Sequence, residues 1–215
     1  MTLARTIRSV APAILLAALL SASAGCQLVA MPFIMWGAEP TKDVPAEFPH
    51  LQNRETCIVV WCDSDTLFEY PNVRLEVSEY VAFAMKAAVK GATFTSNRRV
   101  TELQSREPRW EREPPARLGA KLGAERVLTI ELTQYTMREP DNPHLYRGRI
   151  AANLRVYDAA SPESRWLWQG NVEIAYPPDS VGSWGVPETQ IRRGAMELFA
   201  SEVAGKFHDR KIKVK

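Results

Sequence analysis

The feature that most constrains the fold is a continuous apolar run, Cys57-Ile58-Val59-Val60-Trp61-Cys62. A strand that is apolar on both sides must be covered on both faces, which is typical of a strand inside a sheet flanked by helices. The run therefore predicts an α/β (α+β) domain. Its two cysteines are five residues apart, so their side chains point to opposite faces and cannot bridge each other. We expect two buried free thiols.

Two helices and a loop are predicted between this strand and the next clear strand. Apolar residues at helical spacing over 73–88, capped by Asn72 and ended by Gly91, predict the first helix. Pro114-Pro115 and Gly123 bracket a shorter second helix. In the segment 98–117, six arginines alternate with four glutamates around Trp110. Such balanced charge predicts a solvated or protein-contacting loop.

Three stretches with alternating apolar and polar residues predict strands buried on one side only: 125–136, 147–158 and 165–176. Short connections, such as 159–164, predict an antiparallel meander with one wet face. A long helix is predicted over 187–211, where apolar residues recur at a spacing of four. A short extended piece around 92–95 or 99–102 predicts one more strand, between the first two helices. The predicted order is therefore β-α-β-α-β-β-β-α, a mixed sheet with helices mainly on one face.

Residues 1–25 indicate a secretory signal. Arg5 and Arg8 precede an apolar stretch over 10–20, and small residues follow up to Cys26. Without this segment the chain has 25 basic and 25 acidic residues, because the segment holds two of the 27 basic residues and no acidic one. A neutral chain has no global attraction for nucleic acid, so we expect no nucleic-acid partner.

The tetrapeptide Ser23-Ala24-Gly25-Cys26 resembles the lipobox of bacterial lipoproteins, with Ser23 where that motif usually has leucine. The resemblance implies cleavage before Cys26, diacylglycerol on its thiol and an acyl chain on its amine. Two or three chains anchor a protein stably to a bilayer. We therefore expect a protein anchored on the periplasmic side, with this covalent lipid and no other cofactor. In the enterobacterial pattern, Gln27 in place of aspartate favours the outer membrane.

Two other outcomes of the signal remain open. Ala22-Ser23-Ala24 also fits the rule for cleavage between small residues, which would release a soluble protein starting at Gly25. The stretch 9–38 carries no charge and is long enough for an uncleaved membrane span, although prolines at 12 and 32 interrupt it.

Two further segments follow the signal. Residues 26–54 comprise the lipidated cysteine and a tether, because three of the eleven residues in 39–49 are prolines, which favour an extended chain. Residues 55–212 are predicted to form a single α/β domain.

Asp63 and Asp65 follow the first strand directly, where open α/β sheets often bind ligands. They are weak candidates for a metal site, because Ca²⁺ takes six to eight oxygen ligands. Turn capping is the favoured role. The sequence contains no histidine pair at metal-ligand spacing, no glycine-rich phosphate loop and no G-x-S-x-G elbow. An enzyme with a pocket near Asp63 and Asp65 is therefore the alternative, and a protein without catalysis the leading hypothesis.

The pattern over about residues 55–210 resembles a small domain of bacterial envelope lipoproteins. The residues that carry it are the run 118–128 from a helix into a strand, the hairpin with Tyr157-Asp158 and Trp166-Leu167-Trp168, and the C-terminal helix. Similar domains occur in the curli-secretion lipoprotein, the lipoprotein activator of penicillin-binding proteins and the amino-terminal domain of the Tol system's β-propeller protein. The resemblance implies an accessory role: binding another envelope protein, or forming a homo-oligomer for secretion or assembly.

A binding role needs a surface, and the sequence offers two kinds. The wet face of the meander presents polar side chains, and tryptophans lie in two of the predicted loops. The candidate binding residues are Trp110, Arg155, Gln169, Asn171, Glu173 and Trp184.

Overall fold

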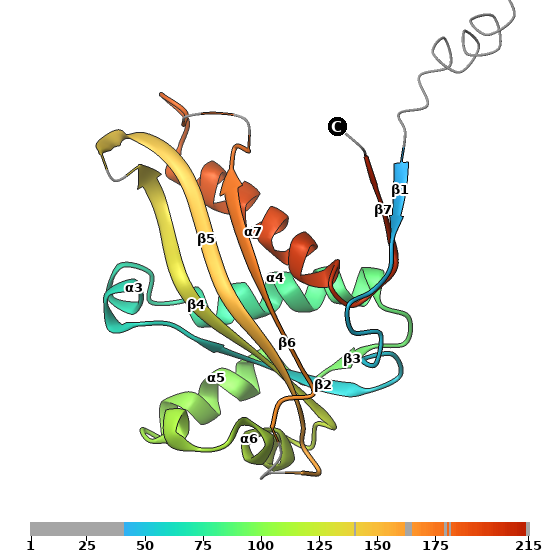
Figure 1. The fold of residues 1–215 in the computed structure, drawn as a ribbon. Coiled ribbons are helices and arrows are strands. Elements are labelled where there is room, and N and C mark those ends of the chain that lie inside the picture. The colour runs from blue at the N-terminus through green and yellow to red at the C-terminus, as the bar shows by residue number, and fades with distance from the viewer. Residues whose placement is uncertain (1–40, 140, 162–164, 179, 181, 214–215) are drawn as a thin grey trace, which may run out of the picture. The chain divides into compact units, whose positions relative to one another are not determined.

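The computed structural model describes residues 41–139, 141–161, 165–178, 180 and 182–213 (Figure 1). They belong to two units. In the smaller one, β1 (Thr41–Val44) pairs with β7 (Arg210–Lys213). The larger one comprises residues 44–210. The signal segment 1–25 and Cys26 lie outside the described residues.

The larger unit is built on a mixed five-stranded sheet in the order β3-β2-β4-β5-β6. The parallel pairs are β2–β3 and β2–β4, and the antiparallel pairs are β4–β5 and β5–β6. Both the mixed sheet and the C-terminal meander are therefore confirmed. The strands are β2 (Glu55–Trp61), β3 (Thr93–Phe94), β4 (Arg126–Glu139), β5 (Asn142–Asp158) and β6 (Trp168–Tyr176).

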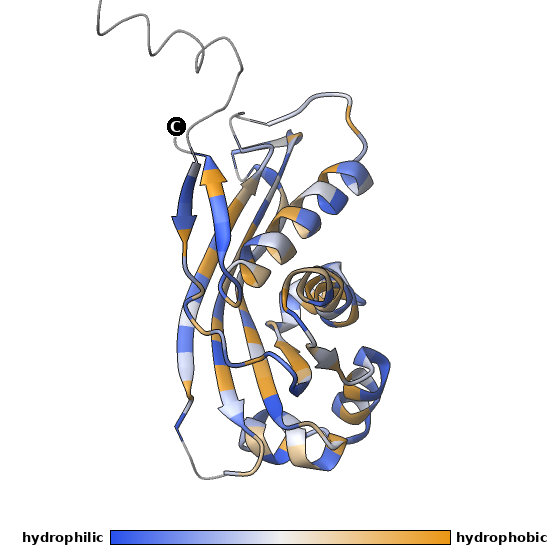
Figure 2. Cartoon of the chain, turned by 90° about the vertical axis from the view of Figure 1, so that its right-hand side faces the viewer, coloured by the Kyte–Doolittle hydropathy of each residue, from blue (hydrophilic) through white to orange (hydrophobic). Residues whose placement is uncertain are grey.

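Strand β2 supplies two separate cores, as its apolar run predicts. Ile58 and Val60 point into the larger core, where α4 (Val73–Ala88) and α7 (Glu188–Ala204) pack. Cys57 and Val59 point into a smaller core on the other face. Figure 2 shows the two long helices on the same side of the strands.

The smaller core is covered by three short helical elements: α5 (Asn97–Arg106), the 3₁₀-helix η1 (Trp110–Arg112) and α6 (Pro115–Leu122). The prediction that the helices lie mainly on one face therefore holds for the two long helices but not for the three short ones. The short helices lie on the opposite face because the apolar side chains of β2 and β4 on that face also need cover. Helix α6 ends as predicted, at Gly123 in the left-handed conformation.

Helix α7 packs closely on β5 at a glycine. A Cβ atom added to Gly148 would lie 2.6 Å from the Cβ of Ala195 and 3.4 Å from the sulfur of Met137. The strand therefore has no side chain where the helix backbone comes nearest. The apolar side chains of α7 reach the larger core around this contact.

The predicted loop over 98–117 is wrong in its first half. Residues 97–106 form α5, in which Val100 and Gln104 are buried one turn apart. The side-chain amide of Gln104 donates a 3.0 Å hydrogen bond to the carbonyl of Val60. Only a contact with β2, distant in sequence, places this polar residue inside.

The predicted helix over 187–211 is too long. Helix α7 ends at Ala204, and the chain then turns so that Phe207 is fully buried. The ring of Phe207 packs edge-on against Trp168, with 5.2 Å between the ring centroids. Burial of this ring replaces the last turns of the expected helix, because a large aromatic side chain gains more free energy in the core than on an exposed helix end.

The packed unit begins before residue 55, the predicted start of the domain. Phe48 and Leu51 are buried in the larger core. The backbone N–H groups of Glu47 and Phe48 donate to the carbonyl of Lys206 at 2.8 and 3.0 Å. This stretch is therefore part of the packed unit and not of an extended tether.

Among the described residues, no helix combines the length and apolar content needed to cross a membrane.

Candidate binding site on the outer face

We call the face of β4, β5 and β6 that is turned away from α4 and α7 the outer face. Cross-strand pairing places Arg155 opposite Gln169 and Asn153 opposite Asn171, with Glu173 next along β6. The side chains of Gln169, Asn171 and Glu173 are exposed, and that of Arg155 is about one-third exposed. Four of the predicted binding residues therefore lie together, as strand alternation predicts.

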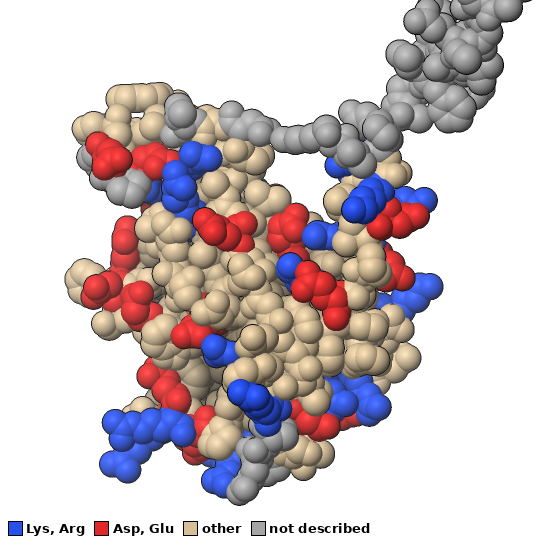
Figure 3. All heavy atoms as spheres, in the orientation of Figure 1, with Lys and Arg blue, Asp and Glu red and all other residues tan. Residues whose placement is uncertain are grey.

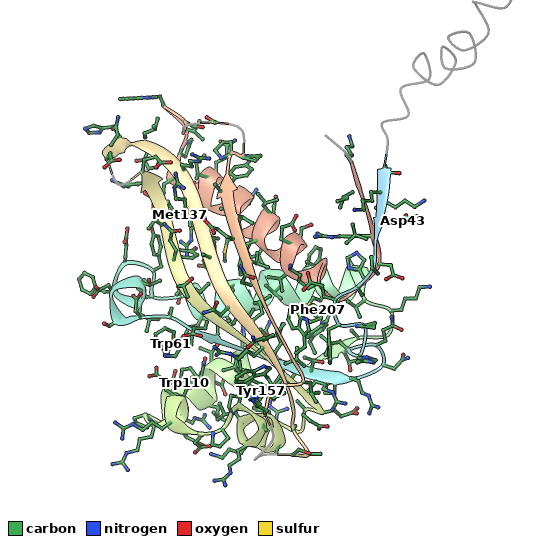
Figure 4. The ribbon with its side chains drawn as sticks, in the orientation of Figure 1. Asp43, Trp61, Trp110, Met137, Tyr157 and Phe207 are labelled. Atoms are coloured by element: carbon green, nitrogen blue, oxygen red, sulfur yellow. The ribbon has the colours of Figure 1, made fainter. Side chains whose placement is uncertain are left out.

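A cavity of about 250 Å³ lies between the outer face and the elements η1 and α6. We call it the aromatic cavity, because three rings line it: Trp61, Trp110 and Tyr157 (Figure 4). Three carboxylates and one guanidinium also line it, and its apolar wall is aliphatic. Its other lining residues are Glu111, Glu113, Glu131, Arg155, Val59, Pro115, Leu118, Thr129 and Ile130.

Strand register brings most of these side chains together. Trp61 pairs with Glu131 across the parallel β2–β4 contact, and Thr129 pairs with Arg155 across the antiparallel β4–β5 contact. Alternation then puts Tyr157 on the same face as Arg155, two residues along β5. The 3₁₀-helix adds Trp110 from a distant part of the sequence.

Each carboxylate of the cavity has a cationic neighbour. Glu131 lies 3.3 Å from Arg155, and Glu111 lies 3.2 Å from Arg74. Glu113 lies 2.9 Å from Lys121. All three carboxylates are partly exposed, so each pair contributes little to stability, at most about 1 kcal/mol.

The two predicted tryptophans differ in role. Trp110 is only 6% exposed and forms a wall of the cavity, so its role as a binding residue stays a prediction. Its ring packs beneath the guanidinium of Arg74, 5.1 Å from the ring centroid, which explains its burial. Trp184 is 68% exposed and stacks on His144, with 6.4 Å between centroids.

Trp184 lies apart from the aromatic cavity. The neighbouring Ser183 bridges to Tyr146, near the start of β5. Tyr146 is nine residues from Arg155, which at about 3.3 Å per residue is roughly 30 Å along the strand. The structure therefore does not bring Trp184 together with the other candidates.

Asp63 has the capping role that the sequence favours. Its carboxylate accepts a 2.7 Å hydrogen bond from the backbone N–H of Thr66 at the start of α3 (Ser64–Glu69). This hydrogen bond lowers the pKa of Asp63 below its usual value. Across the described residues, no three histidine, cysteine, aspartate or glutamate side chains gather to form a metal site with Asp63 or Asp65.

Cys57 in β2 and Cys62 directly after it are buried free thiols on opposite faces, as predicted. Burial raises the pKa of Cys57 to about 12. Burial also raises the pKa of Cys62, against the opposing effect of nearby Arg74. A thiol in its neutral form is a poor nucleophile, so neither side chain is suited to covalent catalysis.

Charged side chains of both signs are interspersed over the face of the molecule seen in Figure 3. This distribution agrees with the balanced charge of the chain without its signal.

No family model matches the chain, and no curated protein matches it. Several solved structures do. The PelC dodecamer from Paraburkholderia phytofirmans is 8% identical, with a TM-score of 0.48 over 80% of this chain and 98% of that chain. Lipoprotein GNA1162 from Neisseria meningitidis is 16% identical, with a TM-score of 0.44 over 70% of this chain and 98% of that chain. The protein CT253 from Chlamydia trachomatis is 16% identical, with a TM-score of 0.42 over 71% of this chain and 96% of that chain.

The structures similar to this chain thus include bacterial lipoproteins. The narrower resemblance to the curli, Tol and penicillin-binding-protein lipoproteins stays a prediction.

Proposed function

We propose that this chain is a lipid-anchored lipoprotein of the bacterial envelope whose α/β domain binds another envelope protein and catalyses no reaction. The lipobox-like segment that ends at Cys26 supports the anchor. Its orientation is to the periplasmic side, and the residue after the cysteine favours the outer membrane.

The observation that most supports a binding role is that the aromatic cavity lies beside the exposed polar side chains of Gln169, Asn171 and Glu173 on the outer face. Tryptophan, tyrosine and arginine are the residue types that contribute most to protein interfaces, and Trp61, Tyr157 and Arg155 meet at this cavity. The larger core lies on the opposite face, beneath α4 and α7. A partner bound at the outer face would therefore leave that core undisturbed.

The anchor is tested by the mass of the N-terminal peptide from protein recovered in its native membrane fraction. We expect Cys26 with diacylglycerol on its thiol and an acyl chain on its amine, and loss of membrane attachment in Cys26→Ala. A peptide that starts at unmodified Gly25 would contradict the anchor and indicate a secreted protein. An intact N-terminus would indicate a membrane span.

The binding role is tested by photo-crosslinking in cells from single positions on each face. A crosslinker at Gln169 on the outer face is expected to capture a defined envelope protein. The matched control is Glu79, an exposed residue of α4. Equal capture from both positions, or none from Gln169, would contradict the proposal. Capture of a second copy of the chain would indicate a subunit of an assembly.

A further inference from the structure

The three rings of the aromatic cavity favour a positively charged guest. The faces of tryptophan and tyrosine carry negative partial charge, and a cation within about 6 Å of a ring centroid is attracted to it. The same attraction already operates inside this fold, because the guanidinium of Arg74 lies 5.1 Å from the centroid of Trp110. Arg74 is not part of the cavity lining, so it does not occupy the space between Trp61, Trp110 and Tyr157.

The charged side chains that line the cavity also favour a positively charged guest. Glu111, Glu113 and Glu131 supply three carboxylates, against the single guanidinium of Arg155. The cations that pair with Glu111 and Glu113 are Arg74 and Lys121, and neither lines the cavity. A carboxylate has about four lone-pair sites, so an ion pair on one side leaves it able to accept from a guest on the other.

The cation that does line the cavity is drawn partly away from it. The guanidinium of Arg155 lies 5.5 Å from the ring centroid of Trp166, which is not a lining residue. Arg155 also lies 3.3 Å from Glu131, so it competes with a guest for that carboxylate. Removing the charge of Arg155 would therefore make the cavity more acidic.

The size and shape of the cavity indicate which kind of cationic group it can hold. At about 250 Å³ the cavity is smaller than the sites that take drug-sized ligands, which begin at about 300 Å³. The wall of Val59, Leu118 and Pro115 is apolar and suits a methylene stem with a charged end. Lysine and arginine side chains have this form, and arginine also stacks on aromatic rings.

We infer that the aromatic cavity receives the lysine or arginine side chain of a protein partner, held between the rings of Trp61, Trp110 and Tyr157 and the carboxylate of Glu131. This inference rests on the proposed binding function and names the chemistry of the partner at that site.

The first test uses the full-length protein in detergent, with ¹⁵N-labelled tryptophan and indole signals assigned by single Trp→Phe variants. The probe is argininamide, and its counterpart is citrullinamide, which differs only in having an uncharged ureido group in place of the guanidinium. Argininamide is expected to shift the signals of Trp61 and Trp110 in a saturable way, whereas citrullinamide leaves them unchanged. Equal shifts with both probes, or no saturable shift with argininamide, would overturn the inference.

Matched variants separate the charge of the cavity from the charge of the surface. Glu131→Gln is expected to weaken argininamide binding by up to about fivefold, because an ion pair with a partly exposed carboxylate is worth at most about 1 kcal/mol. Arg155→Gln is expected to strengthen it by about threefold. Glu79→Gln, at an exposed position of α4 outside the lining, is expected to change nothing. An unchanged affinity in Glu131→Gln would overturn the inference, as would an equal loss in Glu79→Gln.

The second test links the cavity to the partner. If Gln169 captures a partner, Glu131→Gln is expected to reduce that capture and Glu79→Gln to leave it intact. Argininamide binding with unchanged capture in Glu131→Gln would overturn the assignment to a partner's side chain and indicate a small organic cation, while the proposed binding function would stand.

Discussion

Replacing Gly148 by alanine tests the close packing of α7 on the sheet. The new Cβ would lie 2.6 Å from the Cβ of Ala195, about 1 Å nearer than two carbon atoms approach without repulsion. The Cβ of Ala195 is fixed to the helix backbone and cannot rotate away, so β5 or α7 must shift. Overpacking of this kind lowers the free energy of unfolding by about 1–3 kcal/mol. Alanine also makes the unfolded chain less flexible than glycine does, which raises the free energy of unfolding by about 0.4–1 kcal/mol. We expect a net loss of about 1–2 kcal/mol.

The assay is equilibrium unfolding in urea, followed by tryptophan fluorescence. With a urea dependence of about 2 kcal/mol per molar, a loss of this size lowers the midpoint by roughly 0.5–1 M. The dependence on urea should itself stay unchanged, because the surface exposed on unfolding is almost the same.

The refutation comes from a double-mutant cycle with Ala195→Gly. Alone, Ala195→Gly should cost about 1–2 kcal/mol, through lower helix propensity and the loss of a buried methyl group. In the double mutant, Ala195→Gly removes the clash that Gly148→Ala creates. The loss in unfolding free energy of the double mutant should therefore be smaller than the sum of the two single losses by at least about 1 kcal/mol. Additivity within about 0.5 kcal/mol would refute the packing argument.

Gly123→Ala is the control for that cycle. Its φ of +76° is strained for alanine, yet an added Cβ would meet nothing within 4 Å. It should cost about 1–2 kcal/mol by backbone strain alone and show no coupling to Ala195→Gly.

The remaining predictions concern buried side chains. Leu154→Ala should cost about 2–5 kcal/mol in urea unfolding, whereas Leu167→Ala, at a 46% exposed position, should cost less than about 0.5 kcal/mol; equal costs would contradict the assigned core. Tyr135→Phe should cost about 1 kcal/mol, because the hydroxyl accepts a 3.1 Å hydrogen bond from Arg192, and no loss in the same assay would count against this bond. The raised pKa of Cys57 means that folding favours the neutral thiol, so its contribution is complete below the ordinary thiol pKa. Above about pH 9 the protein should lose up to about 1.4 kcal/mol per pH unit relative to Cys57→Ala, and parallel pH profiles of the two proteins would contradict this linkage.

Local signals make part of the fold predictable. The apolar run of β2 indicates a strand covered on both faces, and the alternation in β4, β5 and β6 indicates a meander with a wet side. Proline and glycine mark the ends of α6 correctly, because each acts through its own backbone conformation.

Elements that depend on distant contacts are not predictable in this way. Helix α5 is mostly charged or polar, and its buried Gln104 is explained only by the carbonyl of Val60. Phe207 fits the helical spacing of the residues before it, yet it is drawn off the helix by its contact with Trp168. Sequence spacing contains no information on either partner.

The same distinction between local signals and distant contacts applies to the candidate site. Strand alternation alone is enough to put Arg155, Gln169, Asn171 and Glu173 on one face. The cavity beside them also needs the parallel register of Trp61 with Glu131 and the arrival of Trp110 from η1. No local pattern in the sequence indicates either contact. Trp61, Tyr157 and Glu131 are therefore not predicted as site residues from the sequence.

The pairing of β2 has a consequence for the order in which the chain becomes structured. Thr56 lies opposite Arg126, so the most apolar strand finds its main partner only after seventy further residues have been made. Closing so large a loop is slow, and an unpaired apolar strand is prone to aggregate meanwhile. Residues 55–61 are thus both the wall shared by the two cores and an apolar strand that stays without its main partner while seventy further residues are made.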